Sequence, residues 1–176
     1  MPILIEGISV VILCHSIVKK MSGGVDYFYK NLPNKTLRSD GDLACLHFMT
    51  PHDTKAYVDF LNNSGLTYRD KNGAPIDIIV VDQNRGPMVS CDWLDFGHAD
   101  WNNNPGQTVA VCRAKFTKNL GLVAPEGWSY ENSLTANSRF VAADEIPSNL
   151  EFLRHEEGID ILIDRNTGKN FFVRRS

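Results

Sequence analysis

The segment Cys91–Trp101 concentrates side chains that could do chemistry. Its eleven residues include three aspartates, two tryptophans, a phenylalanine, a histidine and a cysteine. Aromatic rings beside carboxylates suit a pocket that stacks an apolar or cationic group and orients its polar end. The preceding loop, 83–87, follows a predicted buried strand, and such loops often carry sites. We therefore predict that residues 83–101 form a surface that recognises a small molecule or a partner protein. The expected ligand-binding residues are Arg85, Asp92, Trp93, Asp95, His98 and Trp101.

The same segment has a purely structural interpretation. Trp93 and Phe96 are three positions apart, a spacing at which two side chains share one face of a helix. They could then be core contacts, with Asp92 and Asp95 in solvent.

An enzyme is the alternative hypothesis. Cys91 could act as a nucleophile with His98 or His47 as its base, because an adjacent imidazole lowers the pKa of a thiol. A metal could instead use His98 with Asp95 or Asp100, but the sequence supplies no convincing third ligand. Phosphate-cradling glycine loops, nucleophile elbows and His-Glu-x-x-His helices are all missing. We therefore predict no metal site and no cofactor.

His47 lies within a predicted strand, where side chains alternate between the two faces of a sheet. Leu46 and Phe48 flank it and have the character of core residues. His47 should then lie on the other face, where it could line a cleft or contact solvent.

Composition narrows the class of protein. Of 176 residues, 43% are hydrophobic and 22% are charged, which is typical of a globular domain and not of a disordered chain. Lysine and arginine number 18 against 21 aspartates and glutamates, giving a net charge of −3. A nucleic-acid binder usually carries a basic face, so we expect no nucleic-acid partner.

The compartment follows from the N-terminus and the cysteines. The apolar run 3–14 has no basic residue before it and is interrupted by Glu6 and Gly7. It is also shorter than the ~20 apolar residues of a membrane span. The four cysteines stand alone without a Cys-x-x-Cys pair. Three of them, Cys14, Cys45 and Cys112, lie in apolar, strand-like runs, as expected of buried reduced thiols. We expect a cytoplasmic protein with no membrane partner, which could form a homo-oligomer through a strand edge at 3–12 or 170–174.

Periodicity and turn signals predict the elements. Thr50 before Pro51, with Gly65 fourteen positions further on, indicates a helix between a polar cap and a glycine. Ala56, Tyr57, Phe60 and Leu61 form its apolar face. The other predicted elements are strands at 3–14, 43–49, 76–82 and 107–116, helices at 25–31 and 148–157, a hairpin turn at 70–73, and a C-terminal hairpin pairing 159–164 with 170–174.

Together these elements predict an α+β fold. We expect a single domain over 1–176, with a mixed or mostly antiparallel sheet, two or three helices packed on one face, and an irregular central segment at about 84–138.

Three stretches resemble segments of an uncharacterised bacterial family of hypothetical proteins of unknown function. They are Leu46–Asp53, Asp77–Gln83 and Cys91–Gly97, and the resemblance extends over roughly residues 3–100. It implies a bacterial, cytoplasmic, soluble protein and no particular activity, and no site residue is carried over from it.

Overall fold

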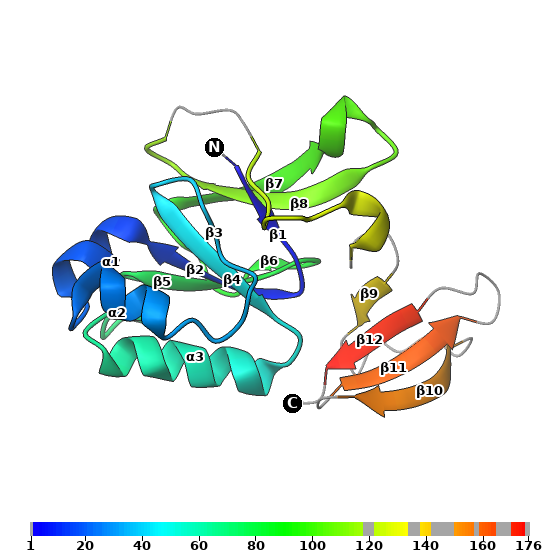
Figure 1. Cartoon of the computed structure of the whole chain (residues 1–176), viewed down its shortest axis with the longest axis horizontal. Coiled ribbons are helices and arrows are strands. Elements are labelled where there is room, and N and C mark those ends of the chain that lie inside the picture. The colour runs from blue at the N-terminus through cyan, green and yellow to red at the C-terminus, as the bar shows by residue number, and fades with distance from the viewer. Residues whose placement is uncertain are drawn as a thin grey trace.

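The structure is a computed structural model that describes residues 2–117, 122–133, 138–141, 150–156, 159–164 and 170–174. It confirms the predicted α+β class, with strands that pair mostly antiparallel in three sheets. Figure 1 shows the helices gathered around one of these sheets.

A five-stranded antiparallel sheet forms the centre. Its order is β3 (Arg38–Ser39), β4 (Leu43–Phe48), β2 (Ile8–Leu13), β5 (Ile78–Asp82) and β6 (Gly86–Pro87). Every residue of β2 is buried, because this central strand is covered on both faces.

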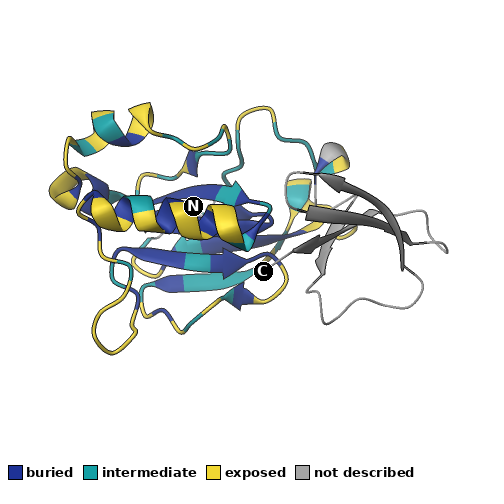
Figure 2. Cartoon of the chain, turned by 90° about the horizontal axis from the view of Figure 1, so that it is seen from below, coloured by how far each residue is buried: buried dark blue, intermediate teal, exposed yellow. Residues whose placement is uncertain are grey.

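Three helices cover one face of this sheet: α1 (Cys14–Lys20), α2 (Gly24–Lys30) and α3 (Pro51–Asn63). Val10 and Ile12 point towards them and share a core cluster with Ile17, Phe28 and Leu61 of the helices. Figure 2 shows α3 alternating between buried and exposed residues, as expected of a helix lying on a sheet. The prediction that helices pack on one face is confirmed.

Both ends of α3 follow the predicted signals. The Thr50 side chain accepts a hydrogen bond of 3.1 Å from the Asp53 amide, and Pro51 opens the helix. Gly65 has a φ of +111°, and the Leu66 amide donates back to the Leu61 carbonyl (3.1 Å). Leu66 therefore folds over the last turn, where it is 3% exposed.

A three-stranded sheet packs on the opposite face of the central sheet. Its order is β1 (Ile3–Ile5), β8 (Thr108–Ala114) and β7 (Leu94–Asp100). The shared core contains three free cysteines, Cys45, Cys91 and Cys112. The half-buried Cys14 instead begins α1, a helix that the sequence did not predict.

The predicted single strand at 3–14 is wrong in its extent. Glu6 and Gly7 separate β1 from β2, and Gly7 has a φ of +56°. Glycine adopts this left-handed conformation readily. The chain therefore turns between the two halves of the apolar run and enters two different sheets.

The outer face of the three-stranded sheet is also covered. Leu4, Val109 and Val111 pack beneath Trp101 and Trp128. Backbone bonds between Leu4 and Val123, and between Val123 and Pro2, hold residues near 123 against β1.

The last described strands form a third sheet, in the order β10 (Leu150–Glu156), β11 (Ile159–Asp164), β12 (Asn170–Arg174) and β9 (Ser138–Val141). The predicted C-terminal hairpin is confirmed by the antiparallel pairing of β11 with β12. Its loop, 165–169, lies outside the described residues.

The predicted helix at 148–157 is wrong, because β10 occupies 150–156 and pairs with β11. Long-range pairing here overrides the local helix signals. Residues 148, 149 and 157 lie outside the described part of the chain.

A short hairpin joins α3 to β5. Arg69 forms a β-bridge to Pro75 around the predicted turn, and the strand β5 begins only at Ile78.

Asp77, immediately before β5, connects this hairpin to α1. Its carboxylate accepts hydrogen bonds from Ser16 Oγ (2.6 Å), the Thr67 amide (2.7 Å) and Lys20 Nζ (2.9 Å). Burial acts to raise the pKa of Asp77, but these bonds outweigh it and lower the pKa. Asp77 therefore ties α1 to the hairpin.

Among the described residues, no helix has the length and apolar character needed to cross a bilayer.

Replacing Gly65 by alanine should destabilise the fold for two reasons. The positive φ costs an L-residue about 1–2 kcal/mol, and the new methyl group would collide with the backbone carbonyl oxygen of Lys20. Gly73 also has a positive φ, +84°, but nothing lies within 4 Å of the point that a methyl group would occupy there. Gly73→Ala is therefore the matched control. We expect a larger fall in the free energy of urea unfolding for Gly65→Ala than for Gly73→Ala, and equal falls would contradict the packing argument.

Candidate ligand-binding cavity

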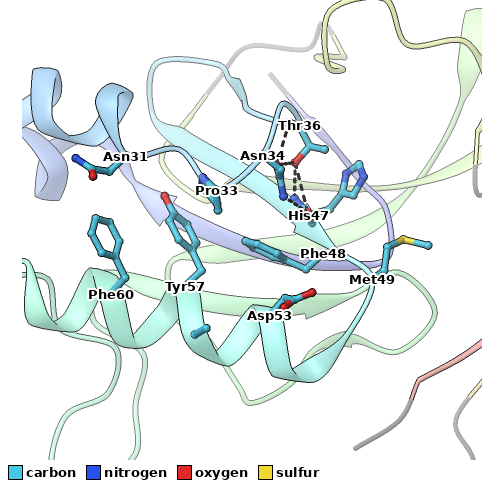
Figure 3. A pocket seen from close by; sticks show the side chains of 11 residues that line it. Asn31, Pro33, Asn34, Thr36, His47, Phe48, Met49, Asp53, Tyr57 and Phe60 are labelled. Carbon is cyan, nitrogen blue, oxygen red and sulfur yellow. Dashed lines mark hydrogen bonds between the residues drawn. The ribbon is translucent and has the colours of Figure 1, made fainter. Parts of the chain in front are cut away.

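A cavity of about 740 Å³ lies between α3, the end of β4 and the loop 31–36. This volume falls in the range of about 300–1,000 Å³ that is typical of small-molecule sites. Figure 3 shows the loop on one side of the cavity and the helix on the other. The lining residues are Asn31, Pro33, Asn34, Thr36, His47, Phe48, Met49, Asp53, Ala56, Tyr57 and Phe60.

Three aromatic rings form one wall of the cavity. Phe48 projects from the helix-facing side of β4, and Tyr57 and Phe60 share a face of α3. The ring centroids of Phe48 and Tyr57 lie 5.5 Å apart, and those of Tyr57 and Phe60 lie 5.9 Å apart with an interplanar angle of 15°. Such a wall can hold an apolar or planar molecule.

The Tyr57 hydroxyl is the one unsatisfied polar group of this wall within the described residues. Tyr57 is only 4% exposed, and its hydroxyl has no hydrogen-bond partner. In Figure 3 the oxygen points towards the loop that carries Asn31 and Pro33, and the surrounding atoms enclose it. Burial raises the pKa of Tyr57, so the phenol stays neutral. A buried unsatisfied hydroxyl costs about 1–3 kcal/mol, which a hydrogen-bonding guest would recover in part.

The loop wall is held rigidly by its own hydrogen bonds. Asn34 Oδ1 accepts from the Thr36 hydroxyl (2.6 Å), and Asn34 Nδ2 donates to the His47 carbonyl (2.9 Å). Thr36 Oγ1 accepts from the His47 amide (2.9 Å). The loop is therefore fastened to β4 in a fixed shape, which lowers the entropic cost of binding.

His47 lies on the face of β4 opposite Phe48, as the alternating pattern predicted. Its Nδ1 is 3.1 Å from Nη1 of Arg38. A guanidinium only donates hydrogen bonds, so Nδ1 accepts and the ring proton resides on Nε2. Burial, and then the charge of Arg38, lowers the pKa of His47 to about 3. The ring is therefore neutral and weakly basic at physiological pH.

The structure does not place Cys91 in the surroundings of a nucleophile. The residue is 8% exposed and packs in the apolar core between the two sheets, where burial raises the pKa of its thiol. An activated cysteine needs the opposite shift. His98, its proposed base, is exposed on β7. It lies four residues beyond Leu94, the first residue of that strand, which corresponds to about 13 Å along the strand.

The other residues predicted from 83–101 do not surround one cavity. The Trp93 indole donates to the Pro75 carbonyl (3.2 Å) and packs against the core between the sheets. Trp101 lies on the outer face, with its ring centroid 4.5 Å from that of Trp128. The two tryptophans therefore belong to different faces of the three-stranded sheet.

The charged members of that set are also dispersed. Arg85 and Asp92 are exposed, and Asp95 pairs with Arg113 (3.5 Å). Asp95 and His98 line a depression of about 340 Å³, whereas Trp101 lines a different one. The segment is not helical, because β7 is a strand, but Trp93 and Phe96 both pack against the core between the sheets, as the structural interpretation expected. A binding role for 83–101 stays a prediction.

Among the residues that the structure describes, no group of three or more His, Cys, Asp or Glu side chains is placed to hold a metal ion.

The sequence placed Tyr57 and Phe60 on the apolar face of a helix without identifying a site. The available signal was the hydroxyl of Tyr57, a polar group on a core face that needs a partner. Nothing in the sequence indicated that the loop 31–36 would form the opposite wall.

The half-buried position of His47 beside Arg38 predicts a pH-dependent stability. Folded His47 takes up a proton only near pH 3, whereas an unfolded histidine does so near pH 6.5. Between these values the unfolded chain binds more protons, so the free energy of unfolding should fall as pH decreases. From pH 7 to pH 5 the fall due to His47 is about 2 kcal/mol at most.

The control is His47→Asn, which keeps an acceptor for Arg38 but does not titrate in this range. Urea unfolding at both pH values should show a smaller pH-dependent loss for this variant. Identical losses in the variant and the parent would contradict the assignment.

No family model, curated protein or solved structure matches this chain. The resemblance to bacterial proteins of unknown function therefore stays a prediction, and the geometry of the cavity is the basis for assigning a function.

Proposed function

We propose that this protein is a non-catalytic binding protein that holds a small organic molecule between α3, the end of β4 and the loop 31–36. The observation that carries the proposal is the Tyr57 hydroxyl, which is buried and unpartnered at the wall of a cavity of about 740 Å³. A hydrogen bond from a guest would satisfy this group, while Phe48 and Phe60 contact its apolar part.

Binding is favoured over catalysis by the state of the nearby groups. His47, with its pKa lowered to about 3 by burial and then Arg38, is poorly suited to accept a proton at neutral pH. The thiol of Cys91 is buried in the core, away from the cavity lining. The walls are preorganised to hold a molecule, and no nucleophile with an adjacent base lines the cavity among the described residues.

A bacterial, cytoplasmic protein is part of the same proposal. All four cysteines are free thiols, which suits a reducing compartment.

The substitution Tyr57→Phe tests the proposal, because it removes only the hydroxyl. The unliganded variant should be as stable as the parent or up to about 1 kcal/mol more stable, since a buried unsatisfied group is lost. Its affinity for a cavity ligand should fall about 2- to 10-fold, the equivalent of one hydrogen bond. A thermal-shift screen of metabolites would identify ligands of the parent, and calorimetry would compare the two proteins.

Tyr29→Phe is the matched control. Tyr29 is 57% exposed on α2, so its loss should change neither stability nor affinity. The proposal fails if Tyr57→Phe binds every ligand as tightly as the parent does. It also fails if no screened compound stabilises the parent, or if ligand stabilisation is lost on Trp93→Phe or Trp101→Phe and not on Tyr57→Phe.

A further inference from the structure

The charge of the cavity indicates what kind of molecule it accepts. Among its described lining residues Asp53 is the only one that is charged at neutral pH, because His47 is neutral and neither lysine nor arginine contributes. Asp53 lies in the first turn of α3, where its backbone amide donates to Thr50 Oγ1. Its carboxylate makes no ion pair with a described residue, in contrast to Asp59, which is 2.7 Å from Lys55 Nζ.

Asp53 and Tyr57 are placed to contact the same molecule. They are four positions apart on α3 and therefore share a face, with their Cβ atoms about 5–6 Å apart. In Figure 3 the carboxylate lies beside Phe48, and the Tyr57 hydroxyl lies on the other side of that ring. A guest on the aromatic wall can thus contact a hydroxyl at one end and a carboxylate at the other.

We propose, on the basis of the function proposed above, that the ligand is an organic cation, an amine carried on an aromatic or other apolar body. Its ammonium group contacts Asp53 at the exposed side of the cavity. Its body packs against Phe48, Tyr57 and Phe60, whose ring faces also attract cations. A second polar atom of the ligand satisfies the Tyr57 hydroxyl.

An anionic ligand would meet an unfavourable field. The positive end of the α3 dipole would attract it, but that dipole is equivalent to only about half a charge. The full negative charge of Asp53 lies in the same turn and outweighs it. Where the structure describes the lining, no side-chain cation is present to balance a ligand carboxylate or phosphate.

Three probes of nearly equal shape, each with a phenol hydroxyl as the second polar group, separate the possibilities: tyramine, 4-hydroxyphenylacetamide and 4-hydroxyphenylacetate, which are cationic, neutral and anionic at pH 7. Calorimetry or ligand-observed NMR on the intact chain should give the tightest binding for the amine. We expect about 2- to 10-fold tighter binding than for the amide, as for an exposed ion pair combined with a cation–π contact. 4-Hydroxyphenylacetate should bind more weakly than the amide. The preference for the amine should shrink in 1 M salt, which screens exposed charges.

Asp53→Asn removes the charge with little change of shape and leaves the Thr50 cap in place. This variant should lose the preference for the amine and bind the amide as the parent does. Asp59→Asn is the matched control, because Asp59 lies on the same helix but does not line this cavity. It should leave all three affinities unchanged.

The outcomes distinguish this inference from the function on which it rests. The inference alone would be overturned if the amide or 4-hydroxyphenylacetate bound at least as tightly as the amine, or if Asp53→Asn kept the preference for the amine. In either case the proposed function stands provided that Tyr57→Phe still weakens binding of the amide. If none of the probes binds, the ligands found in the metabolite screen decide: a majority of cations supports the inference, and a majority of neutral or anionic compounds overturns it. If the screen also finds nothing, both proposals fail.

Discussion

The Arg38 guanidinium is the contact on which the arrangement of both sheets depends. Arg38 is 3% exposed, and its donors reach four acceptors on separate segments. Nε and Nη2 donate to the Leu4 carbonyl of β1 (3.0 and 2.8 Å), and Nη2 also donates to Ser9 Oγ of β2 (3.4 Å). Nη1 donates to the Thr36 carbonyl (2.9 Å) and to His47 of β4 (3.1 Å). A buried cation is costly unless its donors are satisfied, so these segments must keep their relative positions.

The buried Arg38 side chain also helps to set the shape of the cavity. Thr36 accepts from Arg38 through its carbonyl and fastens the loop 31–36 to His47 through its hydroxyl. The same guanidinium contributes to the neutral state of His47, so a cavity next to a cation has no positive side chain in its described lining. A group outside the cavity thereby fixes the position of one wall and helps to keep His47 neutral.

Local signals in the sequence were sufficient where a structure depends on neighbouring residues. Thr50, Pro51 and Gly65 predicted the ends of α3, and the alternation around His47 predicted its face. Prediction failed where distant strands decide the outcome. The run 3–14 divides between two sheets, the segment 150–156 pairs with β11, and 94–100 pairs with β8. The aromatic and acidic composition of 91–101 predicted a site there and gave no indication of the loop 31–36, because a cavity made by two remote segments has no signature in either one.

The three cysteines between the sheets make the separation of the two layers visible to a thiol reagent. Cys45 belongs to β4, Cys112 to β8, and Cys91 precedes β7, so the thiols span both layers of one core. Burial raises the pKa of each of them, and a protonated, enclosed thiol is inert to alkylating reagents. Their labelling rates would therefore measure how often the two sheets separate, a motion otherwise followed by hydrogen exchange. Cys14 is half-buried at the start of α1, so it would react before the other three. Its labelling rate would serve as the reference for a thiol that reacts without separation of the sheets. The labelling rates of these three native thiols would therefore report how often the core between the two sheets opens.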